Sequence, residues 1–200
     1  VFFSASDRSA SRDSSEIWSA FRCERKSLTR CTISRALSRF AVTTISLHAV
    51  LEQLRVVIEP DWSDAEARLN WDLGPQDLQV LADPHELLQT LLNLTQNALR
   101  AVQDPRCQKR QLTIAITAQP ERAVVHVIDT GPGVAHPASL FQPFGAGAGQ
   151  TGLGLFIART LVRSFDGDVV HVPTAAGCRF DVLLLRGVCG DAPSPRELAA

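Results

Sequence analysis

Asp129-Thr-Gly-Pro-Gly133 decides how this chain folds, because it ends one buried strand and opens a tight turn. The residues before it, Val124 to Ile128, have the β-branched content of a buried strand, and the apolar run stops at the carboxylate. A carboxylate at the buried end of a strand is costly unless something donates hydrogen bonds to it. Gly131 and Gly133 let a flat ligand approach the backbone closely. The stretch therefore predicts an acceptor for a group such as an exocyclic amine.

A second glycine-rich stretch, Gly145 to Leu155, leads into apolar residues at helical spacing from Phe156 to Val162. We expect a loop that feeds the N-terminus of a helix, where unpaired N–H groups and partial positive charge favour anions. Glycines there allow phosphate oxygens to reach the backbone. A glycine-rich stretch alone is more typical of an ordinary surface loop, so the phosphate-site interpretation depends on the neighbouring motifs.

A helix is predicted ahead of both stretches, with Asp83 as N-cap, Pro84 in the first turn and Glu86 reaching back to the cap. Asn93 and Asn97 are four residues apart and lie on the same face of this helix. Two amides at that spacing can hold a hydrated cation between the protein and phosphates. An exposed polar face is the simpler interpretation of two helical asparagines, but the motifs that follow favour a site.

Together these motifs resemble the catalytic and ATP-binding domain of sensor histidine kinases, in the GHKL superfamily shared with gyrase, the large heat-shock chaperone and mismatch-repair ATPases. The resemblance covers roughly residues 46 to 186. Five motifs of the family have similar stretches in this chain. The asparagine box is similar to Leu91-Leu-Asn-Leu-Thr-Gln-Asn-Ala98, the first glycine box to Asp129-Thr-Gly-Pro-Gly133, and the phenylalanine box to Leu140-Phe-Gln-Pro-Phe144. The second glycine box is similar to Thr151-Gly-Leu-Gly-Leu155, and the last glycine turn to Gly177-Cys-Arg-Phe180.

The resemblance implies ATP and Mg²⁺ as cofactors. It implies that Asn97 ligates the magnesium ion, that Asp129 accepts from the adenine amine, and that Gly152 and Gly154 line the triphosphate. The candidate catalytic residues are Asn93, Asn97 and Arg100. The candidate nucleotide-binding residues are Asn93, Asn97, Arg100, Asp129, Gly131, Gly133, Phe141, Phe144, Thr151, Gly152, Leu153, Gly154, Leu155 and Cys178.

The reaction expected from this resemblance is phosphoryl transfer and not hydrolysis. Related hydrolases carry an acidic residue one helical turn before the magnesium asparagine, and Asn93 at that position cannot take a proton. Positioning and charge neutralisation would then supply most of the catalysis. By resemblance, the acceptor is a histidine on a dimerisation domain, the full-length protein is a homodimer, and a response regulator receives the phosphoryl group.

Three departures from the family pattern keep a second interpretation open. No phosphoacceptor motif is present, since His48 is followed by Ala49 instead of an acidic residue. The segment Gly145 to Gln150 contains no basic residue, and Gln150 replaces the usual first glycine of the second glycine box. Arg100 is then the main cation expected near the terminal phosphate. The alternative is a truncated or degenerate nucleotide-binding module without kinase activity of its own.

The expected fold is α/β, a two-layer sandwich of the Bergerat type with a mixed sheet and helices on one face. The first helix is expected to begin after Ser46 and to end near Pro60. A half-buried strand at 67–73 and an extended link at 78–81 precede the helix that carries the asparagines. A hairpin then joins 111–116 to 123–128, and strands at 169–172 and 180–185 complete the sheet.

Composition bounds the remaining possibilities. Residues 1–45 are rich in serine and arginine, and we expect a poorly ordered or aberrant segment there, for instance one translated from a shifted frame, with a flexible tail at 187–200. The net charge of −1 gives no case for nucleic acid or an anionic membrane. Five cysteines without CxxC spacing, and no apolar run of membrane-spanning length, favour a cytoplasmic location, with any anchor in a missing N-terminal part.

Overall fold

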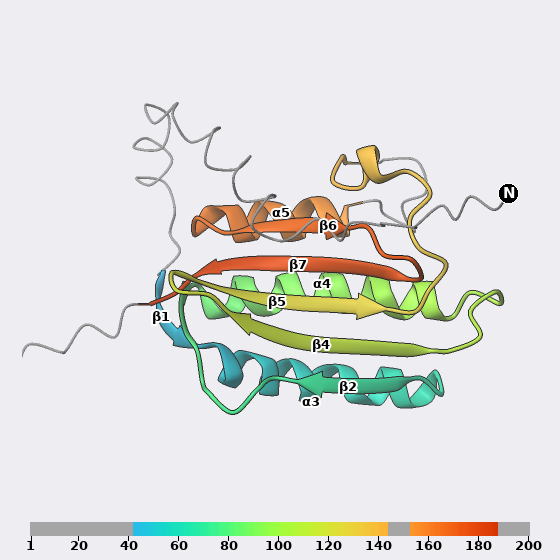
Figure 1. The fold of residues 1–200 in the computed structure, drawn as a ribbon, viewed down its shortest axis with the longest axis horizontal. Coiled ribbons are helices and arrows are strands. Elements are labelled where there is room, and N and C mark those ends of the chain that lie inside the picture. The colour runs from blue at the N-terminus through green and yellow to red at the C-terminus, as the bar shows by residue number, and fades with distance from the viewer. Residues whose placement is uncertain (1–41, 144–152, 188–200) are drawn as a thin grey trace, which may run out of the picture. The chain divides into compact units, whose positions relative to one another are not determined.

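A five-stranded mixed sheet forms one layer of the computed structural model, which describes residues 42–143 and 153–187 (Figure 1). The strand order is β2-β4-β5-β7-β6, in which β2 runs parallel to β4 and every other neighbouring pair is antiparallel. The antiparallel pairing of β4 with β5 confirms the predicted hairpin. The bounds are β2 Arg68–Asp72, β4 Gln111–Ala118, β5 Arg122–Asp129, β6 Asp168–Val172 and β7 Cys178–Leu185.

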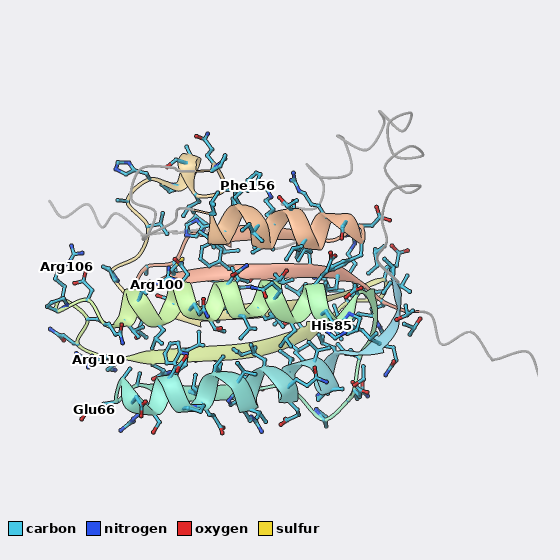
Figure 2. The ribbon with its side chains drawn as sticks, turned by 180° about the vertical axis from the view of Figure 1, so that it is seen from behind. Glu66, His85, Arg100, Arg106, Arg110 and Phe156 are labelled. Carbon is cyan, nitrogen blue, oxygen red and sulfur yellow. The ribbon has the colours of Figure 1, made fainter. Side chains whose placement is uncertain are left out.

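Three helices of the described residues form the second layer, and these three cover the same face of the sheet. They lie behind the strands in Figure 1 and in front of them in Figure 2. Because side chains alternate along a strand, every second residue of the sheet meets the apolar stripes of the helices in one core. The predicted two-layer sandwich is confirmed. The helices are α3 Leu47–Asp64, α4 Pro84–Val102 and α5 Gly154–Ser164, with a short 3₁₀ turn, η1, at Pro137–Ser139.

A second, two-stranded sheet pairs β1, Thr43–Ser46, antiparallel with β3, Gln79–Ala82. The sequence predicts an extended link at the position of β3 but no partner for it, and β1 begins before the expected boundary at residue 46. An isolated bridge joins Val80 to Arg186, and the Gly187 N–H donates to the Gln79 carbonyl over 2.8 Å. The small sheet therefore lies against the segment that follows β7.

Helix α3 begins where the sequence predicts, because the Ser46 hydroxyl accepts a hydrogen bond from the Ala49 N–H over 3.0 Å. Its predicted end near Pro60 is wrong, since the helix continues to Asp64. Pro60 lies on the exposed side, where the carbonyl that loses its partner can face water. Trp62 is only 1% exposed, so its packing in the core holds the last turn in the helix.

Helix α4 also begins as predicted, with the Asp83 carboxylate accepting from the backbone N–H groups of His85 and Glu86 at 2.8 and 3.1 Å. The expected reach of Glu86 back to the cap is wrong. The Glu86 carboxylate instead accepts a hydrogen bond from the Ser164 hydroxyl of α5 over 2.7 Å. A local cap signal therefore turned out to be a tertiary contact between the two helices.

No described helix has the length and apolar character needed to cross a membrane. The two cysteines in the described ranges, Cys107 and Cys178, are free thiols. The expected segment 1–45, the tail and the stretch from Phe144 to Gly152 lie largely or wholly outside residues 42–143 and 153–187, so the expectations about them stay predictions.

Candidate functional site

Asp129 is the last residue of β5 and lies at the floor of the candidate site. Its side chain is 2% exposed, and its Oδ1 accepts a hydrogen bond from the Gly131 N–H over 2.9 Å. Burial raises the pKa of Asp129 to about 6, although the backbone N–H groups of Gly131 and Cys178 act in the opposite direction. The group is therefore a carboxylate near neutral pH, with acceptor capacity that two backbone donors leave incomplete.

Two glycines allow the backbone to close around this carboxylate. A Cβ at Gly177, where φ is +79°, would lie 2.0 Å from the Asp129 carbonyl oxygen. A Cβ at Gly131 would lie 2.7 Å from the Ala101 Cβ of α4. The predicted glycine turns at 129–133 and 177–180 thus meet each other, and the first of them touches the last turn of α4.

The contact with Ala101 brings the asparagine face of α4 next to Asp129. Asn97 lies one turn before Ala101 on the same face, and Asn93 lies one turn earlier again. The Asn93 Oδ1 accepts from the Gln89 side chain over 3.3 Å, but its Nδ2 is buried and has no hydrogen-bond partner among the described residues. A buried donor without an acceptor is costly and marks a position that a ligand atom can satisfy.

The N-terminus of α5 lies beside this asparagine face. The Thr90 hydroxyl of α4 donates to the Ala158 carbonyl of α5 over 3.4 Å. The Glu86–Ser164 hydrogen bond joins the first turn of α4 to the last residue of α5. These contacts run α5 antiparallel to α4, so Gly154 comes level with the asparagines. Figure 2 shows Phe156 and Arg100 at the same end of the helical layer.

This helix end is open to an anion. Leu153 occupies the N-cap position and provides no side-chain hydrogen bond, so no side chain among the described residues caps the first N–H groups of α5. A Cβ built on Gly154 meets no atom of the described residues within 4 Å. The N–H groups of a first helical turn with such space beside them suit phosphate oxygens.

Phe141 and Cys178 close the side of the site between α5 and β7. The Phe141 ring packs edge-on against Phe180, with ring centroids 6.2 Å apart and an interplanar angle of 80°. Phe180 follows Cys178 by two residues and so shares its face of β7. Burial, together with the charge of Asp129, raises the pKa of the Cys178 thiol to about 12, so this thiol stays protonated.

The structure brings together most of the residues expected from the sequence: Asn93, Asn97, Asp129, Gly131, Gly133, Phe141, Leu153, Gly154, Leu155 and Cys178 belong to the segments described above. Arg100 lies exposed in the last turn of α4. Phe144, Thr151 and Gly152 lie outside the described residues. Sequence reasoning missed Arg159, whose guanidinium lies 4.6 Å from the Phe141 ring centroid. The four-residue spacing of Arg159 and Arg163 on a helix was the available signal.

Comparison with protein families decides the assignment. Residues 82–187 match the model of the histidine kinase-, DNA gyrase B- and HSP90-like ATPase family. The chain belongs to this family. The matched residues contain α4, the glycine turn after β5 and the start of α5, which are the segments that build the site.

Relatives narrow the membership to sensor histidine kinases. The chain is 40% identical to the sensor protein kinase PilS of Pseudomonas aeruginosa over 106 residues, which are 50% of this chain and 19% of PilS. It is 31% identical to the sensory histidine kinase/phosphatase NtrB of Escherichia coli O157:H7 over 151 residues, which are 70% of this chain and 43% of NtrB. The chain thus spans less than half of either relative.

Solved structures share the fold. The catalytic domain of histidine kinase ThkA aligns with a TM-score of 0.65 at 24% identity, covering 74% of this chain and 97% of that domain. ThkA in complex with the response regulator protein TrrA aligns with a TM-score of 0.64 at 19% identity, covering 92% and 53%. The family model and the relatives together identify the chain as an ATP-binding catalytic domain of the sensor histidine kinase type.

Proposed function

We propose that this domain binds ATP together with Mg²⁺ and transfers the γ-phosphoryl group to a histidine on a dimerisation domain, in two-component signal transduction. The observation that carries the proposal is the position of Asn93 and Asn97 beside the N-terminus of α5, which no described side chain caps. Buried Asp129 lies beside Gly131, which adjoins the next turn of α4 at Ala101. One end of this arrangement suits an adenine and the other suits phosphates.

Each part of ATP has a counterpart among these residues. Asp129 would accept a hydrogen bond from the adenine amine, because its buried carboxylate lacks the solvent that would otherwise satisfy it. The N–H groups at the start of α5 would bind phosphate oxygens. Phe141 and Cys178 would lie along the base, and the unpaired Nδ2 of Asn93 would donate to a phosphate oxygen.

The donor set also fits Mg²⁺. Magnesium is commonly held by one or two protein oxygens together with substrate phosphates, and the amide oxygen of half-buried Asn97 is such a ligand. The described residues contain no group of three His, Cys, Asp or Glu side chains that could hold a metal by itself, so the phosphates would complete the coordination. When bound, the ion would offset charge on the phosphates.

Transfer is favoured over hydrolysis by the side chain at position 93. An amide cannot accept a proton from water, so Asn93 orients the phosphate but cannot activate a water molecule. An imidazole nitrogen of the acceptor histidine would form the new bond to the γ-phosphorus, while the bond to the β-phosphate oxygen breaks and ADP leaves. The domain supplies position and charge complementarity.

Partners follow from the same proposal. The histidine kinase ThkA is known in complex with a response regulator protein, and we infer that a response regulator receives the phosphoryl group here. We also infer that the full-length protein is a homodimer and that this domain works in the cytoplasm, where ATP is available. A degenerate domain that holds nucleotide and transfers nothing is the second candidate, and the lack of a phosphoacceptor motif in the sequence favours it.

A titration and a transfer assay test the proposal and separate the two candidates. Calorimetry of this chain with ADP and Mg²⁺ is expected to show binding at one site. Addition of ATP and a separately produced dimerisation hairpin is then expected to give acid-labile phosphohistidine. Binding without transfer would favour the degenerate domain, and no binding would contradict both.

Arg100→Ala is expected to weaken ATP about fivefold and ADP less than twofold, because an exposed arginine near the phosphates contributes modestly and only to the γ-phosphate. Parallel titrations with ATP and ADP measure the difference. Arg106→Ala is the matched control, since Arg106 is also exposed but its guanidinium pairs with Asp104 at 2.8 Å. Equal losses for ATP and ADP would contradict the role of Arg100.

Affinity for the adenine base is expected to rise about tenfold between about pH 5 and pH 7, because burial raises the pKa of Asp129 to about 6 and only the carboxylate is a full acceptor. Adenosine is the ligand of choice because it carries no phosphate that titrates. The ligand-free domain should lose stability over the same rise in pH, since the folded-state pKa lies above the usual value of 3.8. A flat adenosine profile would contradict the assignment.

A further inference from the structure

A buried carboxylate at the start of β6 holds two arginines of α5. Asp168 is 1% exposed, and it accepts from Arg159 Nε and Nη2 at 2.7 and 3.0 Å and from Arg163 Nε and Nη2 at 3.0 and 3.1 Å. Burial opposes ionisation of Asp168, but the two guanidinium groups outweigh it and keep the pKa of the carboxyl below its usual range. Both arginines therefore have a fixed anchor.

The two arginines differ in what else they touch. The Arg159 guanidinium carbon lies 4.6 Å from the centroid of the Phe141 ring, and the Arg159 side chain is 29% exposed. In the described part of the chain, no comparable ring contact is found for Arg163, which is 50% exposed. A guanidinium whose fork is held by a carboxylate can stack on a ring at low entropic cost. Only Arg159 connects the anchor to an aromatic side chain.

Phe141 is the far end of a segment that begins at the candidate adenine acceptor. The segment 130–141 starts at the turn through Gly131, directly after Asp129, and passes η1 before it reaches Phe141. At that end, the ring lies between Arg159 and Phe180. Phe180 shares a strand face with Cys178, whose register partner is Asp129. Both ends of the segment are therefore tied to the same edge of the site.

We propose that Arg159 is a positioning residue for the nucleotide site: anchored by Asp168, it fixes Phe141 and thereby holds segment 130–141 against α5 and β7. The proposal rests on the proposed function, because the site that the segment borders is the ATP site. Arg159 touches neither Asp129 nor the asparagines in the described contacts, so its effect passes through Phe141.

Arg159→Gln and Arg163→Gln form a matched pair, since each removes two hydrogen bonds to Asp168 and only the first removes the ring contact. We expect Arg159→Gln to weaken ADP about fivefold and Arg163→Gln by less than twofold. In the ligand-free full chain, backbone hydrogen exchange at 134–141 is expected to speed up in Arg159→Gln alone. Thermal melts of both variants establish that they remain folded.

A double-mutant cycle with Phe141→Leu identifies the path of the effect. Phe141→Leu is expected to weaken ADP at least as much as Arg159→Gln, because Phe141 itself would lie along the base. Adding Arg159→Gln to Phe141→Leu should weaken ADP no further, whereas Phe141→Leu and Arg163→Gln should add. Additive losses for Arg159→Gln, or equal exchange in the two arginine variants, would overturn the role of Arg159. Because exchange is measured without ligand, failure of the unmodified chain to bind ADP would overturn the proposed function separately.

Discussion

Asp129→Asn is expected to weaken ADP binding about a hundredfold near neutral pH and, at the same time, to make the ligand-free domain more stable. The loss follows because the amide replaces a charged acceptor by a weaker one and presents an N–H₂ group that opposes the adenine amine. The gain follows because the buried carboxylate, with its pKa raised to about 6, disfavours the folded state once it is ionised. A shift of about two pKa units corresponds to about 3 kcal/mol as an upper value for the gain.

Calorimetric titration and denaturant unfolding measure the two effects on the same variant. Asp181→Asn is the matched control, because Asp181 is also a buried carboxylate. Asp181 lies three residues after Cys178 on β7 and therefore on the face of the sheet opposite to Cys178 and its register partner Asp129. Burial opposes its ionisation too, but hydrogen bonds from His126 and Arg179 at 2.7 Å prevail and lower its pKa. Asp181→Asn should therefore destabilise the domain and leave ADP affinity unchanged. The same sign of stability change for both variants would contradict this account.

Asn97→Ala is expected to reduce phosphoryl transfer at least about a hundredfold, because loss of the proposed magnesium ligand would misplace the phosphates and leave their charge uncompensated. The ATP dissociation constant should lose its dependence on Mg²⁺, while adenosine affinity stays within about twofold because the adenine end is untouched. Alanine is a better helix former than asparagine, so the fold should be retained.

Titrations of ATP with and without Mg²⁺, followed by the transfer assay, measure these effects. Gln96→Ala is the control, since Gln96 is the exposed neighbour of Asn97 on α4 and points away from the site. Retention of Mg²⁺-dependent ATP binding in Asn97→Ala, or an equal loss in Gln96→Ala, would remove Asn97 as the ligand.

Features that depend on neighbouring residues could be predicted from the sequence. The caps at Ser46 and Asp83 are formed by side chains within three residues of the N–H groups they serve, so their signals are local. The hairpin of β4 and β5 turns within the few residues between Ala118 and Arg122, so its signal is local too. The same holds for the asparagine spacing on α4 and for the carboxylate that ends β5.

Features that depend on distant partners could not be predicted. β1 pairs with β3 across the whole of α3 and β2, and nothing in the composition of either strand names the other. Glu86 carried a capping pattern, yet a hydroxyl 78 residues away satisfies it. The raised pKa of Asp129 arises from burial by the assembled layers, and the Asp168–Arg159–Phe141 contacts join three segments that are separate in the chain.

The bridge between Val80 and Arg186 holds the two ends of the folded unit close together. Residues 44 and 187 come together at the small sheet, since a Cβ on Gly187 would touch the Thr44 side chain at 2.6 Å. This meeting point lies near the end of the large sheet where Arg122 pairs with Leu185, and Asp129 and Cys178 lie at the opposite end (Figure 1). A movement transmitted from the segments that flank residues 44 and 187 would therefore reach the folded unit at the end of the large sheet that is remote from Asp129.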